Sequence, residues 1–292
     1  MIRLRAVSSA GILLALLILA HTSRGQDSLA PPPVKGYTRA DGWTGRKIAS
    51  TAVVGAVFVS TWVDAYYTWW KQTEKPFSFF SERWFSEAHG GIDKPGHFFG
   101  TYSIFRVVND VLLWGGYDRS TAFWWATGLS LFNGFQIEVG DGFSQYGFDY
   151  QDLVFDFAGV GYGMLQSEIP LLENFDFKFS YWSKTGINTP IAFTKDYDAM
   201  TIWLSFGMHN LLPEGVARYW PEWLNLAVGY SVDDRESKKE VAIGIDLNFE
   251  GFSTHSENVY VAERLFDLWH APLPAVKFTE RKVPRWYGAY RQ

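Results

Sequence analysis

Five acidic residues lie close together within residues 137–163, among aromatic and aliphatic neighbours. They are Glu138, Asp141, Asp149, Asp152 and Asp156. If the second half of this stretch is helical, Asp149, Asp152 and Asp156 follow a spacing of i, i+3 and i+7 and share one face. A solvated helix face would alternate such acids with Lys or Arg, and the stretch contains neither. We therefore expect partly buried carboxylates, which must find a partner or take up a proton or a cation.

Basic partners for these acids stand upstream, in and after the segment D-K-P-G-H at residues 93–97. Asp93 and His97 are four residues apart and share a face if Pro95 opens a helix, where its missing N–H costs nothing. The expected partners of the acids are Lys94, His97 and Arg106. The sequence therefore predicts two helix ends that meet around a charged cluster.

Two glycines continue the acidic stripe. Gly159 and Gly163 fall on the same predicted helix face as the acids, and glycines four residues apart let a neighbouring backbone approach closely. We therefore expect this face to be a line of contact with another helix.

Carboxylate oxygens and imidazole nitrogens are also ligands for divalent cations. His97, Glu138, Asp141 and Asp152 form a candidate metal site, and a bound cation would activate water for attack on a phosphate or an ester. The spacing matches no established metal motif, since H-E-x-x-H is absent. A buried network that fixes helix packing uses the same groups. The candidate polar cluster comprises Asp93, Lys94, His97, Glu138, Asp141, Asp152 and Asp156. We favour the structural network over the metal site and assign no catalytic residue.

Other residues with chemical potential stand alone. Ser144 lies outside any G-x-S-x-G arrangement, which argues against a serine hydrolase. His209, His255 and His270 are isolated in the sequence, and we expect them at the surface or at strand ends.

The composition indicates a large core and an envelope setting. Of the 292 residues 47% are hydrophobic, enough for one large domain or two small ones. The aromatic share of 18% is more typical of sheet surfaces and membrane-interface belts than of an average soluble enzyme. Candidates for such a belt are Trp69, Trp70, Trp84 and Trp124. A net charge of −5 without a basic cluster argues against nucleic acid as a partner.

The N-terminal residues predict export. Residues 1–25 have the layout of a secretory signal peptide, with Arg3 and Arg5 before an apolar run and small residues before Gln26. The alternative is an uncleaved anchor, although the run is shorter than the roughly 20 residues that a span needs. Residues 26–43 contain three consecutive prolines and are expected to form an extended lead-in.

Four helices are predicted, over residues 46–62, 95–114, 120–139 and 150–167. The first carries no charge over residues 48–63, which implies burial in a bundle or in lipid. Asn133 and Gln136 make the third a poor lipid-facing helix.

Beyond residue 170 the hydrophobic period changes to two. Residues 224–230 and 241–249 alternate as strands do, and with the stretches near Phe175 and Thr201 they predict an antiparallel meander of about four strands. Its apolar face must be covered by helices or by a membrane. An amphipathic closing helix is expected over residues 256–269, followed by a loop-like tail.

The predicted fold class is therefore α+β. An N-terminal bundle of about four apolar helices occupies residues 44–170. The sheet and its closing helix occupy residues 171–292.

Three separated motifs carry a resemblance. The first runs from F-F-S-E-R-W-F to D-K-P-G-H-F-F-G-T-Y, and the second runs from E-V-G-D-G-F-S to G-V-G-Y-G-M-L-Q-S-E. The third comprises K-D-Y-D-A-M-T-I-W-L-S and P-E-W-L-N-L-A-V-G-Y. Over residues 65–250 the sequence thus resembles the YfiM-like family of predicted periplasmic lipoproteins. Through D-K-x-x-H and the later acids it is also similar, more distantly, to the VanZ-like membrane proteins.

The resemblance implies an exported protein, periplasmic or outer-membrane associated, and implies no reaction. That family usually has Asn where Asp156 stands, and the sequence has no cysteine to carry a lipid anchor. We expect a non-enzymatic envelope component that binds membrane lipid or an envelope protein through aromatic surface. The alternatives are a metal-dependent hydrolase or transferase acting on an envelope lipid or glycan precursor with a divalent cation, and an integral bundle of the VanZ type.

Overall fold

The computed structural model describes residues 37–71, 73–80, 88–182, 196–233, 238–252, 256–280 and 282–290. The signal peptide predicted at residues 1–25 lies outside these ranges, as does most of the predicted lead-in. The chain forms two compact units that interleave along the sequence. Unit 1 comprises residues 1–80, 104–148 and 253–265, and unit 2 comprises residues 81–103, 149–252 and 266–292. The domain limits predicted from the sequence stay predictions.

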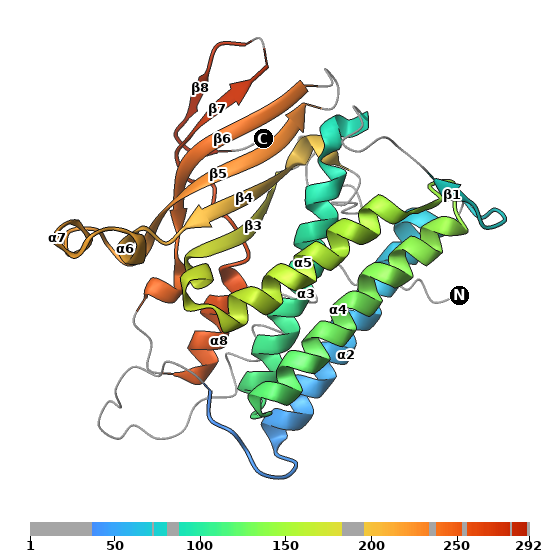
Figure 1. Cartoon of the computed structure of the whole chain (residues 1–292), viewed down its shortest axis with the longest axis horizontal. Coiled ribbons are helices and arrows are strands. Elements are labelled where there is room, and N and C mark those ends of the chain that lie inside the picture. Colours follow the sequence, from blue (N-terminus) through green and yellow to red (C-terminus); the bar gives the residue numbers. More distant parts are fainter. Residues whose placement is uncertain are drawn as a thin grey trace, which may run out of the picture. The chain divides into compact units, whose positions relative to one another are not determined.

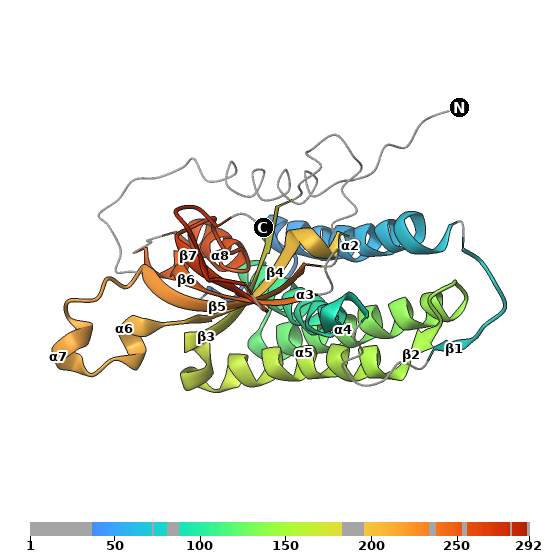
Figure 2. The ribbon, with the colours of Figure 1, turned by 90° about the horizontal axis from the view of Figure 1, so that it is seen from above.

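Unit 1 is built on two long helices that lie alongside each other, α2 (Gly45–Ala65) and α4 (Arg119–Gly142) (Figures 1 and 2). The Thr44 side chain caps α2 by accepting a hydrogen bond from the Lys47 N–H. Asp118 caps α4 in the same way. The helix begins at Arg119, so the predicted start at Ser120 is one residue late.

The contact between α2 and α4 includes polar groups. Thr61 Oγ1 donates to Asn133 Oδ1 over 2.9 Å, and Gln136 Nε2 donates to the same oxygen over 3.2 Å. Phe58 stacks on Phe132 with ring centroids 5.7 Å apart. Asn133 is buried against α2, and Gln136 is bonded to it. These two residues, which argued against a lipid-facing helix, therefore do not interrupt the exposed side of α4.

A π-helical turn, η1 (Tyr66–Trp70), continues α2. Its closing hydrogen bond runs from the Lys71 N–H to the Tyr66 carbonyl over 2.9 Å. The Trp70 ring packs on Gly140, where a Cβ atom would lie 2.0 Å from the ring. Trp70 Nε1 also donates to Asp141 Oδ1 over 2.8 Å. This turn therefore ties the end of α2 to the end of α4.

The last turns of α3 (Asp93–Trp114) and most of α8 (Glu257–Phe266) complete unit 1. Gly115 and Gly116 follow the last residue of α3, and Gly116 has a positive φ of 90°. Glu257 at the start of α8 forms an ion pair with Arg46 of α2.

Unit 2 contains a six-stranded antiparallel sheet in the order β3-β4-β5-β6-β7-β8 (Figure 1). The strands are β3 (Phe175–Tyr181), β4 (Met200–Phe206), β5 (Leu224–Asp233), β6 (Lys238–Leu247), β7 (Ala275–Thr279) and β8 (Arg285–Tyr287). Each strand pairs with its neighbour in sequence, so the sheet is a meander. Helix α5 (Tyr150–Glu168) and the first turns of α3 also belong to this unit.

Short elements connect these parts. They are β1 (Phe79–Phe80), β2 (Phe148–Asp149), η2 (Ala88–Gly91), η3 (Pro170–Asn174), η4 (Tyr197–Ala199), α6 (Met208–Leu211), α7 (Glu214–Ala217) and η6 (Phe249–Gly251).

The two faces of the sheet differ in character. Alternation along the strands places Trp203, Ala227 and Ala242 on one face, in a core that also contains Tyr290. The opposite face is more apolar and buries residues such as Ile202. Small residues on the first face leave room there for polar side chains.

The α+β class is confirmed, and the element counts are corrected. The sheet has six strands rather than about four, because β7 and β8 form where a loop-like tail was predicted. The described residues contain seven α-helices rather than the four of the bundle and the closing helix, because the short helices α6 and α7 were not predicted. The predicted closing helix ends early, at Phe266, and strands follow it. β7 and β8 are too short for a clear alternation signal and depend on pairing with β6.

A charged group is buried on the face of the sheet that carries Trp203. Lys178 is fully buried, with its Nζ 2.7 Å from Asp246 Oδ2 and 2.8 Å from Asp267 Oδ1. Burial opposes the ammonium charge, but the two carboxylates raise the pKa of Lys178 above its ordinary value. Burial raises the pKa of Asp267 to about 7, against the attraction of Lys178. The ionised state of each of these three groups therefore depends on the charges of the other two.

The surface position predicted for His270 is wrong. His270 is 1% exposed, and its ring stacks on Trp203 with centroids 3.8 Å apart. Burial lowers the pKa of His270 to about 4, so its ring is neutral at neutral pH. His209 is partly exposed, and His255 lies outside the described residues.

The Lys178→Met variant is expected to lower the free energy of unfolding by about 3–5 kcal/mol, because two carboxylates would stay buried without their cation. Lys239→Met is the control, since Lys239 is an exposed lysine of β6 and its replacement should change stability by less than about 0.5 kcal/mol. Chemical unfolding followed by circular dichroism measures both. Equal stabilities of the two variants would contradict the role given to Lys178.

Candidate functional site

The start of α3 is anchored on the sheet of unit 2. Ile92, just before the helix, is fully buried in a core with Met200 and Val232. The Tyr230 hydroxyl donates to the Gly90 carbonyl, and Gly90 has a positive φ of 60°, which glycine adopts readily. These contacts hold the first turns of α3, which carry Asp93, Lys94 and His97.

The start of α5 supplies acidic partners. Asp149 is the N-cap, and its Oδ1 accepts a hydrogen bond from the Gln151 N–H over 2.8 Å. Asp152 lies in the first turn, where the helix dipole favours a carboxylate. Asp149, Asp152 and Asp156 are all buried, as their spacing predicted. We call Asp93, Lys94, His97, Asp149, Asp152 and Asp156 the α3–α5 cluster.

Lys94 neutralises the acids at the start of α5. It is 4% exposed, and its Nζ donates to Asp149 Oδ2 over 3.1 Å and to the Asp152 carboxylate. Asp93 Oδ2 lies 3.7 Å from the same nitrogen. Burial opposes the charge, but Asp152 and Asp93 raise the pKa of Lys94 above its ordinary value. Lys94 is therefore protonated at neutral pH.

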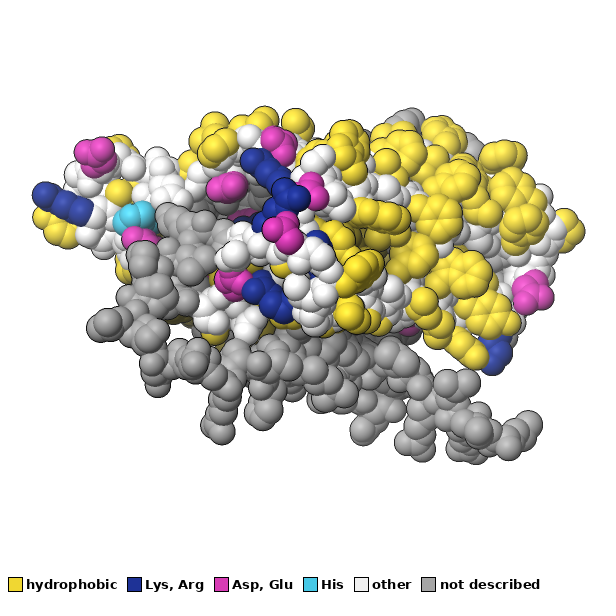
Figure 3. Space-filling view, turned by 90° about the horizontal axis from the view of Figure 1, so that it is seen from below, with side chains coloured by type: hydrophobic (Ala, Val, Ile, Leu, Met, Phe, Trp, Pro, Cys, Tyr) yellow, Lys and Arg dark blue, Asp and Glu magenta, His cyan; other side chains and the backbone are white. Residues whose placement is uncertain are grey.

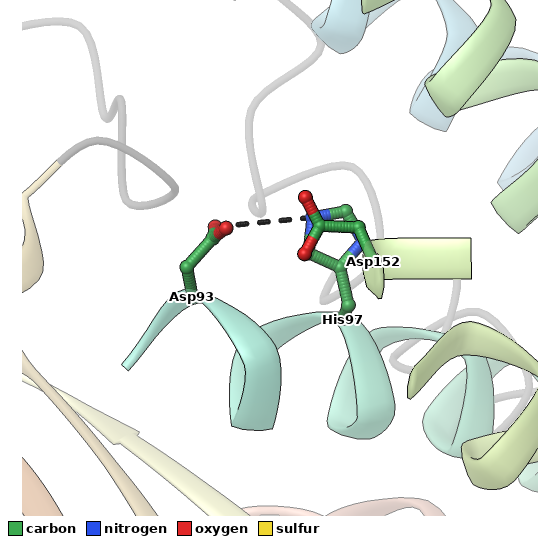
Figure 4. Close-up of side chains that lie close together, drawn as sticks. All are labelled: Asp93, His97 and Asp152. Atoms are coloured by element: carbon green, nitrogen blue, oxygen red, sulfur yellow. Dashed lines mark ion pairs between the residues drawn. The ribbon is translucent and has the colours of Figure 1, made fainter. Parts of the chain in front are cut away.

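His97 lies among three carboxylates. Its Nδ1 is 3.2 Å from Asp156 Oδ1, and its Nε2 is 3.8 Å from both Asp152 Oδ2 and Asp93 Oδ1. Figure 4 shows the Asp93 carboxylate pointing from the same helix toward the His97 ring, with Asp152 beside the ring. Burial disfavours the imidazolium, yet Asp156, Asp152 and Asp93 outweigh it and raise the pKa of His97 well above its ordinary value.

The charge on Asp152 is opposed by burial. Burial raises the pKa of Asp152 to about 6, although His97 and Lys94 favour its ionised form. At neutral pH both partners of the His97–Asp152 pair are therefore ionised. Asp156 Oδ2 is buried and accepts no hydrogen bond from any described residue.

α3 and α5 approach closely beside this cluster. A Cβ atom on Gly159 would lie 2.1 Å from the Phe98 carbonyl oxygen, so only glycine fits. Thr101 Oγ1 donates to the Asp156 carbonyl over 2.8 Å. The predicted contact line at Gly159 is confirmed, and the Thr101 hydrogen bond is a contact that spacing did not indicate.

Within unit 2 the structure brings together five of the seven predicted cluster residues, namely Asp93, Lys94, His97, Asp152 and Asp156. The other two belong to unit 1. Glu138 is buried on α4, and Asp141 accepts the hydrogen bond of Trp70 Nε1. The four-ligand metal site at His97, Glu138, Asp141 and Asp152 stays a prediction.

Two aromatic residues near the cluster were not predicted. The Tyr197 hydroxyl lies 3.5 Å from Asp93 Oδ1, and the Tyr197 ring stacks on His89 with centroids 4.5 Å apart. Tyr197 is 104 residues from Asp93 in sequence, so no local pattern could connect them.

The arrangement permits two kinds of chemistry. In the first, the paired charges alone hold α3 against α5 within unit 2. Ligand atoms of Asp93, His97 and Asp152 also lie within 4.8 Å of one another, a spacing at which a cation can be held.

A family model described as "Predicted periplasmic lipoprotein (DUF2279)" matches residues 81–168, which are 88 of the 292 residues. The matched stretch contains every residue of the α3–α5 cluster. No curated protein and no solved structure matches the chain. The match confirms the predicted location, exported and periplasmic or outer-membrane associated, and assigns no reaction. The likeness to VanZ-like proteins stays a prediction.

Gly159→Ala is expected to lower the free energy of unfolding by about 1–3 kcal/mol, because the new methyl group would meet a backbone carbonyl. Gly161→Ala is a matched control on the same helix, since nothing lies within 4 Å of a Cβ at that position. The control should gain about 0.5–1 kcal/mol from helix propensity. Urea unfolding of both variants measures the two free energies of unfolding. A Gly159→Ala protein as stable as Gly161→Ala would contradict the close packing of α3 on α5.

The stability of the protein is expected to fall as the pH rises above about 7, beyond the pKa of Asp267 and toward the raised pKa of His97. Because the folded-state pKa of His97 is raised, its contribution is complete below the unfolded value of about 6.5 and is lost as the pH rises through the folded value. Asp152 and Asp267 release their protons at about pH 6 and 7, so they act mainly below this window. The slope should reach about 1.4 kcal/mol per pH unit. His97→Gln should flatten it in unfolding measurements, and an unchanged slope would contradict the assignment.

Proposed function

We propose that this protein is a non-enzymatic component of the cell envelope that binds membrane lipid through an apolar face of unit 1. The observation that carries the proposal is the exposure of α2. Residues 45–70 are long and apolar enough to cross a membrane. Only 17% of the most apolar 18-residue stretch within them is buried. The core helix of a soluble protein would be mostly buried. The exposed side of α2 therefore requires a neighbour other than water.

A stripe of uncharged, exposed residues runs along one side of α2. Ile48, Val59 and Trp62 are exposed by 58%, 60% and 54%. They lie at helical spacings on one side of α2. No charged residue occurs over residues 48–63. The stripe is thus continuous over most of the helix.

α4 widens this apolar surface. Phe132 packs on Phe58 of α2 and is itself half exposed. Trp124 and Phe135 are also exposed and share that face of α4. Figure 3 shows hydrophobic side chains gathered over a broad area of one side of the molecule, with few charged side chains among them. Exposed apolar areas of this extent mark interaction surfaces.

The length and the flanking aromatic residues fit a bilayer. Twenty-six helical residues extend about 39 Å, more than the roughly 30 Å of a hydrocarbon core. Trp43 is exposed before α2, and Tyr66 and Tyr67 are exposed after it. Trp and Tyr at both ends are typical of residues at membrane interfaces. Of the predicted belt, Trp124 is exposed, and Trp84 lies outside the described residues.

Membrane binding should be lost when charges enter this surface. The double variant Val59→Glu/Phe135→Glu places two carboxylates where acyl chains are proposed, each costing about 2–3 kcal/mol. Its partitioning onto vesicles of phosphatidylethanolamine and phosphatidylglycerol should fall at least about tenfold in a sedimentation assay. Trp286→Glu is the control, because Trp286 is 70% exposed on β8 of unit 2.

Two outcomes would reject this proposal. One is that the wild-type protein stays in solution with such vesicles and is released from cell membranes by carbonate. The other is that the double variant and the Trp286→Glu control bind equally. An integral bundle of the VanZ type would resist carbonate and lose insertion in the double variant.

A second candidate function is that of a metal-dependent hydrolase or transferase acting on an envelope lipid or glycan precursor. Two observations favour it. Asp93, His97 and Asp152 present ligand atoms within 4.8 Å of one another, and Asp156 Oδ2 is a buried acceptor that forms no hydrogen bond with any described residue. A divalent cation at the three residues would activate water for attack on a phosphate or ester.

Metal binding separates this candidate from the first. Titration of the purified protein with Mn²⁺ or Zn²⁺ should give saturable binding that Asp93→Asn weakens at least about tenfold. Asp93 is only partly buried, so the variant should fold. Glu214→Gln, at the exposed start of α7, is the control. No saturable binding of either metal would leave the α3–α5 cluster as a structural network.

A further inference from the structure

A cavity of about 190 Å³ lies in unit 2, at the end of the sheet away from the Lys178 cluster. It is lined by Asp233, Glu240, Lys277, Thr279, Lys282, Arg285 and Tyr287. A water molecule occupies about 30 Å³ of liquid, so the space admits a group of several heavy atoms. All but one of the lining side chains are charged or carry an aliphatic hydroxyl. The cavity is therefore suited to a polar ligand.

The strand register builds this cavity. Glu240 of β6 stands opposite Thr279 of β7, and Lys277 of β7 stands opposite Arg285 of β8. Alternation along the strands turns these side chains to one face. Ala242 stands opposite Lys277 on the other side of β7, and its short side chain leaves space. The cavity thus follows from the pattern of large polar and small residues along three neighbouring strands.

The floor of the cavity is a buried ion pair. Lys277 Nζ lies 2.9 Å from Glu240 Oε2, and the two side chains are 10% and 4% exposed. Thr279 Oγ1 donates to Glu240 Oε1 over 2.9 Å. Although burial opposes its charge, the neighbouring Tyr290 and Glu240 raise the pKa of Lys277. The floor therefore carries fixed charges of both signs that cancel.

The mouth of the cavity has an excess of positive charge. Lys282 Nζ lies 3.6 Å from Asp233 Oδ2, a loose pair in which the lysine is 28% exposed. Arg285 forms no ion pair or hydrogen bond through its side chain with any described residue. Three cations thus face two carboxylates around the cavity. A guanidinium that faces a polar cavity and has no carboxylate partner can bind an oxyanion through two parallel hydrogen bonds.

We propose that this cavity binds a small oxyanion, a phosphate or carboxylate group, with Arg285 and Lys282 as its cationic ligands. Lys277 and Thr279 line the inner wall, and the Tyr287 ring closes one side. The site is independent of the membrane face of unit 1 and of the α3–α5 cluster, so neither proposed function needs to hold for it.

Calorimetric titration of the purified full chain with inorganic phosphate at neutral pH tests the proposal, with citrate as the carboxylate probe. We expect saturable binding of at least one of the two anions. Arg285→Gln should raise the Kd of that anion at least about tenfold, because a charge-assisted bidentate contact is lost. Arg285 is exposed, so the variant should keep the stability of the wild type.

Arg218→Gln is the matched control. Arg218 is an exposed arginine of unit 2 that lies over the Tyr219 ring and outside the cavity, so its replacement should leave the Kd unchanged. Displacement of bound phosphate by a soluble short-chain phosphatidic acid would support a lipid headgroup as the source of the anion. Displacement by glycerol 3-phosphate alone would support a free small molecule. The proposal is overturned if neither anion binds saturably, or if Arg285→Gln binds as tightly as the wild type.

Discussion

The ion pairs of Lys94 with Asp149 and Asp152 are the interaction on which the helical part of unit 2 depends. The first turns of α3 and α5 lie close together there, and each helix start presents a partial positive charge. Carboxylates at both starts oppose that repulsion, and Lys94 in turn neutralises the carboxylates. The same two helices approach closely at Gly159, where the missing Cβ makes room for the Phe98 carbonyl. Removing one partner would leave a buried charge unpaired, which costs more than the pair contributes.

The sheet of unit 2 also gives each buried charge a counter-ion. Lys178 with Asp246 and Asp267 at one end, and Lys277 with Glu240 at the other, are buried charges that each have a counter-ion. Between them the face carries Trp203 and residues with small side chains. Unit 1 is different, because its two long helices share the hydrogen bond between Thr61 and Asn133 while large apolar side chains such as Trp62 are exposed. One chain thus combines a region that encloses charge with a region that exposes apolar surface.

Much of the local structure could be predicted from the sequence. The four long helices occur where periodicity placed them, and the acids at positions 149, 152 and 156 are buried as their lack of basic neighbours indicated. Burial of His270 could not be predicted, because it depends on Trp203, which is distant in sequence. Strands β7 and β8 were missed because a ladder of three to five residues gains its stability from the neighbouring strand rather than from its own pattern. The cavity beside Arg285 was missed for a related reason, since strand register brings its lining together.

The π-helical turn at the end of α2 has a consequence for how this region tolerates change. A turn with one additional residue rotates everything beyond it by about 100° relative to an uninterrupted α-helix. That rotation is what aims the indole of Trp70 at Gly140 and Asp141 instead of along the exposed stripe. Straightening residues 66–70 into an ordinary α-helix of the same length would point this indole elsewhere, whereas loss of one residue together with the π-helical turn would leave it in place. Relatives of this protein that keep the indole contact are therefore expected either to keep the π-helical turn or to be one residue shorter in this segment.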